Sequence, residues 1–110
     1  MDGKEYREEV LRTYAGSDDP QEKLTLAALG LTGESGEVAD HMKKALFQGH
    51  AIDMAHLRKE LSDILWYIVL ACDATGCSLE DVMQINVDKL RKRYPNGFDA
   101  ERSVHRNRYE

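Results

Sequence analysis

Two long segments in the middle of this chain repeat apolar residues every three to four positions, which is the spacing of one face of an α-helix. The first segment carries Leu24, Ala27, Leu31, Val38, Met42 and Leu46. The second segment carries Leu57, Leu61, Ile64, Ile68 and Ala71. Its stretch ILWYIVLAC is apolar on nearly every side, and a helix of that kind is usually buried from several directions. In a chain of only 110 residues, this pattern indicates a helical fold that also packs against another subunit.

Local start and stop signals set the expected ends of the first two helices. The first helix is expected over about residues 4–15, before the sequence GSDDP. The second is expected to begin at Asp19, whose side chain would form a capping box with Glu22. Pro20 suits the first helical position, and Gly49 is a typical stop. The chain is therefore expected to begin with a short helix followed by a long one.

Two further helices and a tail are expected after this long helix. The third helix is expected over residues 54–74. The fourth begins at Ser78, which can form a capping box with Asp81, and stops before Pro95. Residues 99–110 lack a strong periodicity and are expected to form a flexible tail or a flap. The expected elements are therefore four helices and a tail, without a strand.

These elements predict an all-α fold of the four-helix-bundle type, in one domain over residues 1–110 with its core at about residues 20–98. The net charge of −5 argues against nucleic-acid binding, which needs a basic surface. We expect no membrane partner, since no apolar run is long enough to span a bilayer. The polar, acidic start of the chain has no signal peptide, so a cytoplasmic location is expected.

Two pairs of carboxylates interrupt the apolar faces of the long helices. Glu34 and Glu37 are three residues apart, and Glu60 and Asp63 repeat that spacing on the next helix. If the two helices pack side by side, four acidic groups converge. Burial of unpaired carboxylates is costly, and like charges resist joint ionisation. A divalent cation would offset this cost, and oxygen ligands without cysteine favour Mg²⁺ or Mn²⁺.

Other interpretations of these carboxylates stay open. Each acidic side chain could reach water at the edge of its helix, or pair with Lys43, Lys44 or Lys59. A di-iron bundle is a rival metal site, and it requires Glu-x-x-His on two helices. His41 follows Glu37 by four residues, and no histidine follows the acidic pair of the third helix at that spacing. The histidine spacing therefore does not match a di-iron site.

Polar residues outside the acidic pairs could contact an anionic substrate. Asn86, Lys89 and Arg93 share one face of the fourth helix and could donate to phosphate. Basic residues at this place also interact favourably with the helix dipole without any ligand. Tyr67 lies one turn after Asp63 and could contact substrate or simply pack. No Gly-rich phosphate loop or nucleophile motif is present.

Three stretches together resemble one known family. GESGEVAD and KELSDILWYIV resemble the Glu-x-x-Glu and Glu-x-x-Asp signature of the MazG-like, all-α nucleoside triphosphate pyrophosphohydrolases. NVDKLRKRYPNGF is similar to the element that follows in those proteins. The resemblance covers about residues 24–98. Each stretch alone is a weak signal, but their order and separation make the combination specific.

The resemblance implies an enzyme that cuts a nucleoside triphosphate between the α and β phosphates, giving a nucleoside monophosphate and pyrophosphate. It implies Mg²⁺ as the cofactor, with Mn²⁺ able to replace it. It assigns the metal to Glu34, Glu37, Glu60 and Asp63. Our own hypothesis is that Glu34 or Glu37 is the catalytic base, which takes a proton from the attacking water. The resemblance assigns substrate contacts to Asn86, Lys89, Arg93 and, more weakly, Tyr67. It also implies a homodimer or homotetramer with sites near subunit interfaces.

Two competing functions stay open from the sequence. An enzyme of the same fold could act on dUTP, dCTP, a modified nucleotide or phosphoribosyl-ATP, because no residue pattern reveals the base pocket. A helical module could instead bind a nucleotide or a partner without turning it over. The complete set of four acids argues against a pure binding module, which needs no hydrolytic metal cluster.

Overall fold

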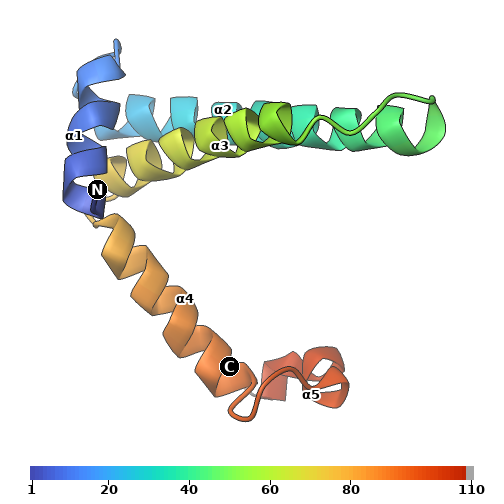
Figure 1. Ribbon diagram of the computed structural model, residues 1–110. Helices are drawn as coiled ribbons and strands as arrows, with labels where there is room; N and C mark the ends of the chain where they lie inside the picture. Colours follow the sequence, from blue (N-terminus) through green and yellow to red (C-terminus); the bar gives the residue numbers. More distant parts are fainter. Residues whose placement is uncertain (109–110) are drawn as a thin grey trace.

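The computed structural model describes residues 1–108, which form helices joined by short loops (Figure 1). In chain order the elements are α1 (Gly3–Thr13), α2 (Pro20–Phe47), α3 (Met54–Ala74), α4 (Leu79–Arg93), α5 (Ala100–Val104) and the 3-10 turn η1 (Arg106–Arg108). No strand forms within these residues, apart from an isolated bridge between Pro95 and Gly97. The all-α class and the four long helices expected from the sequence are confirmed.

The centre of the molecule is an antiparallel hairpin of α2 and α3, crossed at one end by α1 (Figure 1). The buried apolar cluster lies at this crossed end. It comprises Val10 from α1, Ala27 from α2, and Val69 and Leu70 from α3. The other end of the hairpin is closed by the loop between α2 and α3.

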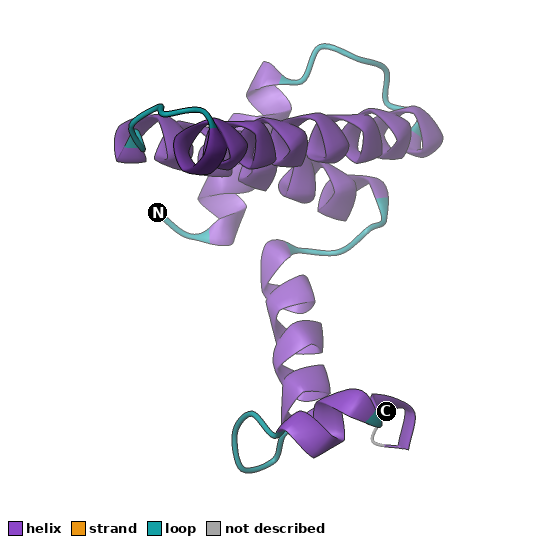
Figure 2. Cartoon of the chain, turned by 90° about the vertical axis from the view of Figure 1, so that its right-hand side faces the viewer, coloured by secondary structure: helices purple, strands orange, loops and turns teal. Residues whose placement is uncertain are grey.

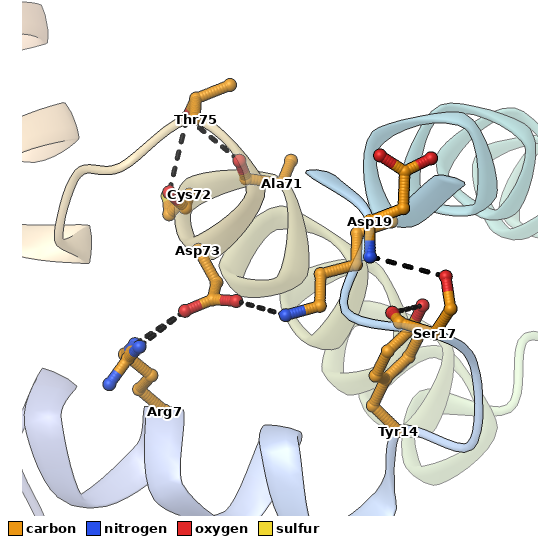
Figure 3. Close-up of polar contacts among 9 residues, drawn as sticks. Arg7, Tyr14, Ser17, Asp19, Ala71, Cys72, Asp73 and Thr75 are labelled. Carbon is orange, nitrogen blue, oxygen red and sulfur yellow. Dashed lines mark hydrogen bonds and ion pairs between the residues drawn. The ribbon is translucent and has the colours of Figure 1, made fainter. Parts of the chain in front are cut away.

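An ion cluster around the largely buried side chain of Asp73 fixes α1 to the hairpin. Asp73 on α3 accepts hydrogen bonds from Arg7 on α1 and, at 3.0 Å, from Lys23 on α2 (Figure 3). Burial alone would raise the pKa of Asp73, but the two cations outweigh it and lower that pKa. A second contact joins α3 to α1, because Trp66 Nε1 donates a hydrogen bond to Thr13 Oγ1 at 2.9 Å. These contacts set the position of α1.

In contrast, α4 leaves the hairpin at the α1 end and extends away from it (Figures 1 and 2). The turn before it contains Gly76 with a φ of +72°, a conformation that favours glycine. At its first turn, Glu80 Oε1 accepts a hydrogen bond from the backbone N–H of Gly3 at 3.0 Å. No residue of α4 is buried. Within one chain, α1–α3 therefore pack together while α4 is a projecting arm.

The helix ends follow the sequence signals with one exception. Ser78 and Asp81 form the expected capping box, and Gly49 adopts a φ of +74° just after α2. The expected capping box of Asp19 with Glu22 is wrong, because the Asp19 side chain makes no capping hydrogen bond. Glu22 accepts a hydrogen bond from the Ser17 hydroxyl at 2.7 Å instead.

The expected tail contains short helical structure in its described part. Asp99 caps α5 by accepting hydrogen bonds from the N–H groups of Glu101 and Arg102. Arg102 donates to the carbonyl oxygens of Lys92 and Arg93 and so satisfies the end of α4. Residues 109–110 of the expected tail lie outside the described residues.

Candidate functional site

Three facing pairs of residues define the register of α2 against α3. Nearest to the apolar cluster, the ring of Tyr67 lies over Gly30. In the middle, the carboxyl groups of Glu37 and Glu60 interact. Towards the loop, the rings of His41 and His56 lie 5.5 Å apart. The acidic residues therefore occupy the middle of the hairpin, between an aromatic contact and a histidine pair.

Three of the four expected acidic residues converge. Carboxylate oxygens of Glu34, Glu37 and Glu60 all lie within 4.8 Å of one another. Glu60 is only 7% exposed, although it is charged. The Oε2 atoms of Glu34 and Glu60 are buried and have no hydrogen-bond partner among the described residues. Buried charged oxygens without partners are costly, so the cluster fits a site for a cation.

The electrostatics of Glu37 reflect this convergence. Its pKa is raised, mainly because the protonated form can donate a hydrogen bond to the carboxyl of Glu60, and also because the Glu60 charge repels the ionised form. Asp63 makes a smaller contribution in the same direction. A cation in the cluster would lower the pKa of Glu37 instead, because it favours the ionised form of each ligand.

Asp63 lies at the edge of this arrangement. It is exposed, and it does not belong to the group of oxygens within 4.8 Å. Its charge nevertheless acts on Glu37 and, from the other side, contributes to a raised pKa of Tyr6, after the larger effect of burial. Asp63 is therefore a neighbour of the three converging carboxylates.

The alternative in which lysines neutralise the cluster is not observed. Lys43 and Lys44 both pair with Asp40, each at 3.0 Å. Within residues 1–108, no lysine or arginine forms an ion pair with Glu34 or Glu37. Glu34 and Glu37 are thus left without a lysine or arginine partner among the described residues.

Histidines border the cluster on the loop side. His56 Nε2 lies 3.3 Å from Glu60 Oε1. His41 Nε2 accepts a hydrogen bond from the backbone N–H of Asp53 at 3.1 Å, so that nitrogen is already engaged. Together with Glu37, Asp40 and Lys44, these residues line a cavity of about 320 Å³. His56 is not among the site residues expected from the sequence, although its position four residues before Glu60 would have indicated the contact.

Tyr67 lies next to the site because Gly30 leaves room for it. A Cβ atom at residue 30 would overlap the tyrosine ring. The ring also packs edge-to-face on Trp66, with ring centroids 5.0 Å apart. The close approach of the Tyr67 ring therefore explains why α2 has a glycine at residue 30.

The expected phosphate-binding residues Asn86, Lys89 and Arg93 are not beside the carboxylates of their own chain. They lie on α4, which leads away from the hairpin (Figure 1). Asn86 and Lys89 are exposed, and Arg93 is partly buried near α5.

No helix in the described part of the chain is long and apolar enough to cross a membrane.

Comparison with known proteins agrees with this geometry. The family model of the MazG nucleotide pyrophosphohydrolase domain matches residues 21–98, which are most of the chain. The chain belongs to the MazG family. The MazG match spans both acidic helices and all of α4. The Gene 37 protein of Mycobacterium phage L5 is 33% identical to this chain over 87 residues, which are 76% of each protein. No solved structure matches the chain significantly.

Proposed function

We propose that this MazG-family chain is a metal-dependent hydrolase that cleaves nucleoside triphosphates between the α and β phosphates. The products would be a nucleoside monophosphate and pyrophosphate. The observation that carries the proposal is the convergence of Glu34, Glu37 and Glu60, with buried, unpartnered oxygens on two of them. A family of nucleotide pyrophosphohydrolases supplies the chemical context.

The three converging carboxylates would hold the divalent ion, and Asp63 would complete the set from the neighbouring turn of α3. Oxygen ligands alone suit Mg²⁺, and Mn²⁺ accepts the same ligands. When bound, such an ion neutralises phosphate oxygens and acidifies a water molecule. The fit rests on the donor set, because buried carboxylate oxygens without a basic partner require a positive charge.

Glu37 or Glu34 would accept the proton of the attacking water. Glu37 is exposed, so its carboxylate is open to a water molecule. Glu34 is partly buried and offers one unpartnered oxygen. The two residues lie one turn apart, so a water positioned between them is within reach of both.

The phosphate chain also needs donors, and the basic face of α4 offers Asn86, Lys89 and Arg93. Because α4 extends away from its own hairpin, we infer that these donors serve the site of a second copy of the chain. Residues 89–108 carry seven Lys or Arg and only two Asp or Glu, whereas the whole chain is acidic. This basic end is complementary in charge to the acidic hairpin of a partner.

Two features of the arm support a homo-oligomer. The apolar residues Val82, Met83, Ile85, Val87 and Leu90 of α4 are all exposed. The radius of gyration is 17.1 Å, whereas a compact domain of this length has about 13 Å. Large apolar surface on an extended helix is stable in water only when another surface covers it. A second copy would also cover Leu61 and Leu65 on the outer side of α3.

Pyrophosphate release tests the reaction. The full chain would be assayed with a panel of canonical and modified nucleoside triphosphates, with Mg²⁺, with Mn²⁺ and with a chelator. We expect metal-dependent release of pyrophosphate and a monophosphate, and the panel ranks the bases, including dUTP and dCTP. Orthophosphate with a diphosphate product would refute the assigned bond. Binding of nucleotide without turnover of any substrate would favour a non-catalytic module instead.

Mixing two inactive variants tests the role of the second copy. Glu60→Gln removes a metal ligand, and Lys89→Ala removes a phosphate donor. If the donor comes from the partner subunit, randomly mixed dimers regain about a quarter of wild-type activity, because half of the dimers contain one intact site. If each site uses its own α4, the mixture stays inactive.

A further inference from the structure

A histidine that no motif predicts touches the most buried carboxylate of the site. His56 precedes Glu60 by one turn on α3, and its Nε2 lies 3.3 Å from Glu60 Oε1. The other oxygen, Oε2, has no partner and belongs to the residue that closes the acidic cluster. Oε1 of Glu60 thus has an imidazole beside it, whereas Oε2 is buried without a partner.

The ring of His56 lies against the ring of His41, and its backbone is fixed at the start of α3. Its backbone N–H donates to Asp53 Oδ1 at 3.1 Å, which fixes the first turn of α3. Its ring packs on the ring of His41, with centroids 5.5 Å apart and planes tilted by 31°. His41 is fixed in turn, because its Nε2 accepts the backbone N–H of Asp53 at 3.1 Å. The loop, α2 and α3 therefore all limit where the His56 ring can lie.

We propose that His56 is a positioning residue that orients the carboxylate of Glu60 towards the divalent ion. The inference rests on the proposed function, since it concerns the same metal site. With its proton on Nε2, the imidazole would hold Oε1 and leave the buried, unpartnered Oε2 for the ion. His56 is not one of the three residues whose ligand atoms lie within 4.8 Å of one another, so it acts through Glu60 and not on the ion.

The need for such a residue follows from the repulsion within the cluster. Glu37 and Glu60 repel each other when both are ionised, as the raised pKa of Glu37 indicates. Without a donor on Oε1, the Glu60 carboxylate gains freedom to turn away from its acidic neighbours. Loss of a group that orients a metal ligand typically lowers metal affinity about 10–100-fold. Saturating metal should overcome the loss, so the turnover number should change much less than the metal affinity.

The test is Mn²⁺ binding to the full chain without nucleotide, followed by electron paramagnetic resonance of the free ion. We expect His56→Ala to weaken Mn²⁺ binding about 10–100-fold relative to wild type. His56→Gln should recover most of the affinity, because the glutamine amide nitrogen lies near the place of Nε2 and can donate. His50→Ala is the matched control, since His50 is an exposed histidine of the loop whose backbone N–H contacts Lys44. This control should bind Mn²⁺ as wild type does.

The outcomes separate this inference from the proposed function. Wild-type affinity in His56→Ala would overturn the positioning role and leave the metal site intact. Equal losses in His56→Ala and His56→Gln would also overturn it, because the donor would then be irrelevant. If wild type binds no Mn²⁺ and releases no pyrophosphate, the proposed function fails and the inference fails with it. In assays, the expected signature is a raised metal requirement with a nearly unchanged turnover number at saturating metal, which a folding defect would not produce.

Discussion

Replacing Glu60 by glutamine should make the metal-free protein more stable while removing its response to metal. Glu60 is 7% exposed, and its Oε2 is buried without a partner. Leaving a buried charged oxygen unpartnered costs about 1–3 kcal/mol or more. The glutamine amide has the same shape, carries no charge and can donate to the carboxylates of Glu34 or Glu37, which lie within 4.8 Å. We therefore expect Glu60→Gln to raise the free energy of unfolding by about 1–3 kcal/mol without metal.

With divalent metal, wild type should instead be more stable than Glu60→Gln. A ligand at 100 times its dissociation constant stabilises the folded state by about 2.7 kcal/mol, if it binds only that state. Wild type should gain this stability from Mg²⁺, and Glu60→Gln should gain little. The negative charge beside His56 is lost in the variant, but the histidine is half-exposed, so this loss subtracts little. The variant should thus be the more stable protein in a chelator and the less stable one in Mg²⁺.

Urea unfolding followed by circular dichroism, with chelator and with Mg²⁺ at about pH 8, measures all four free energies. Glu8→Gln is the matched control, because Glu8 is an exposed glutamate of α1. It should change stability by less than about 0.5 kcal/mol in either condition. The reasoning is refuted if Glu60→Gln is less stable than wild type in chelator, or if both proteins gain equally from Mg²⁺.

Three further predictions concern stability around the site. Asp73→Asn removes the carboxylate that the partly buried Lys23 and the exposed Arg7 share, and should cost more stability than Arg7→Gln, which should cost about 1 kcal/mol or less in the same urea titration. The raised pKa of Glu37 adds stability that is fully present below the unfolded-state pKa and is lost as pH rises through the raised value. In metal-free unfolding measured from about pH 4 upwards, Glu37→Gln should therefore gain stability relative to wild type as the pH rises. Gly30→Ala should displace the tyrosine ring and destabilise by about 1–3 kcal/mol with loss of pyrophosphate release, whereas Gly33→Ala, where a Cβ meets nothing, should stabilise α2 by up to about 1 kcal/mol.

The helices and the acidic convergence could be predicted because both depend on local patterns. Apolar spacing, the capping box at Ser78 and the glycine after α2 act within a few residues, so they fixed the helix ends. Once two helices form a hairpin, carboxylates on their facing sides come close together. The convergence of Glu34, Glu37 and Glu60 follows from that arrangement.

The direction of α4 could not be predicted, because it depends on contacts far from the helix itself. It is set by the turn at Gly76 and by the contact of Gly3 with Glu80, and neither leaves a periodic signal. The exposed place of Asp63 depends on small differences in side-chain direction at equal spacing. The contact between His56 and Glu60 was not predicted, because motifs compare residue types, whereas this contact depends on geometry.

The distribution of buried residues links the stability of the hairpin to its chemistry. Among the described residues, the buried apolar side chains all lie at the end crossed by α1. Towards the loop, the buried residue of the hairpin is Glu60, which repels Glu37 and cannot act as a core residue by itself. That half of the hairpin therefore lacks the apolar burial that holds most helix pairs together. A bound cation would supply the missing attraction between α2 and α3, so the ion that serves the reaction would also hold the two helices in register.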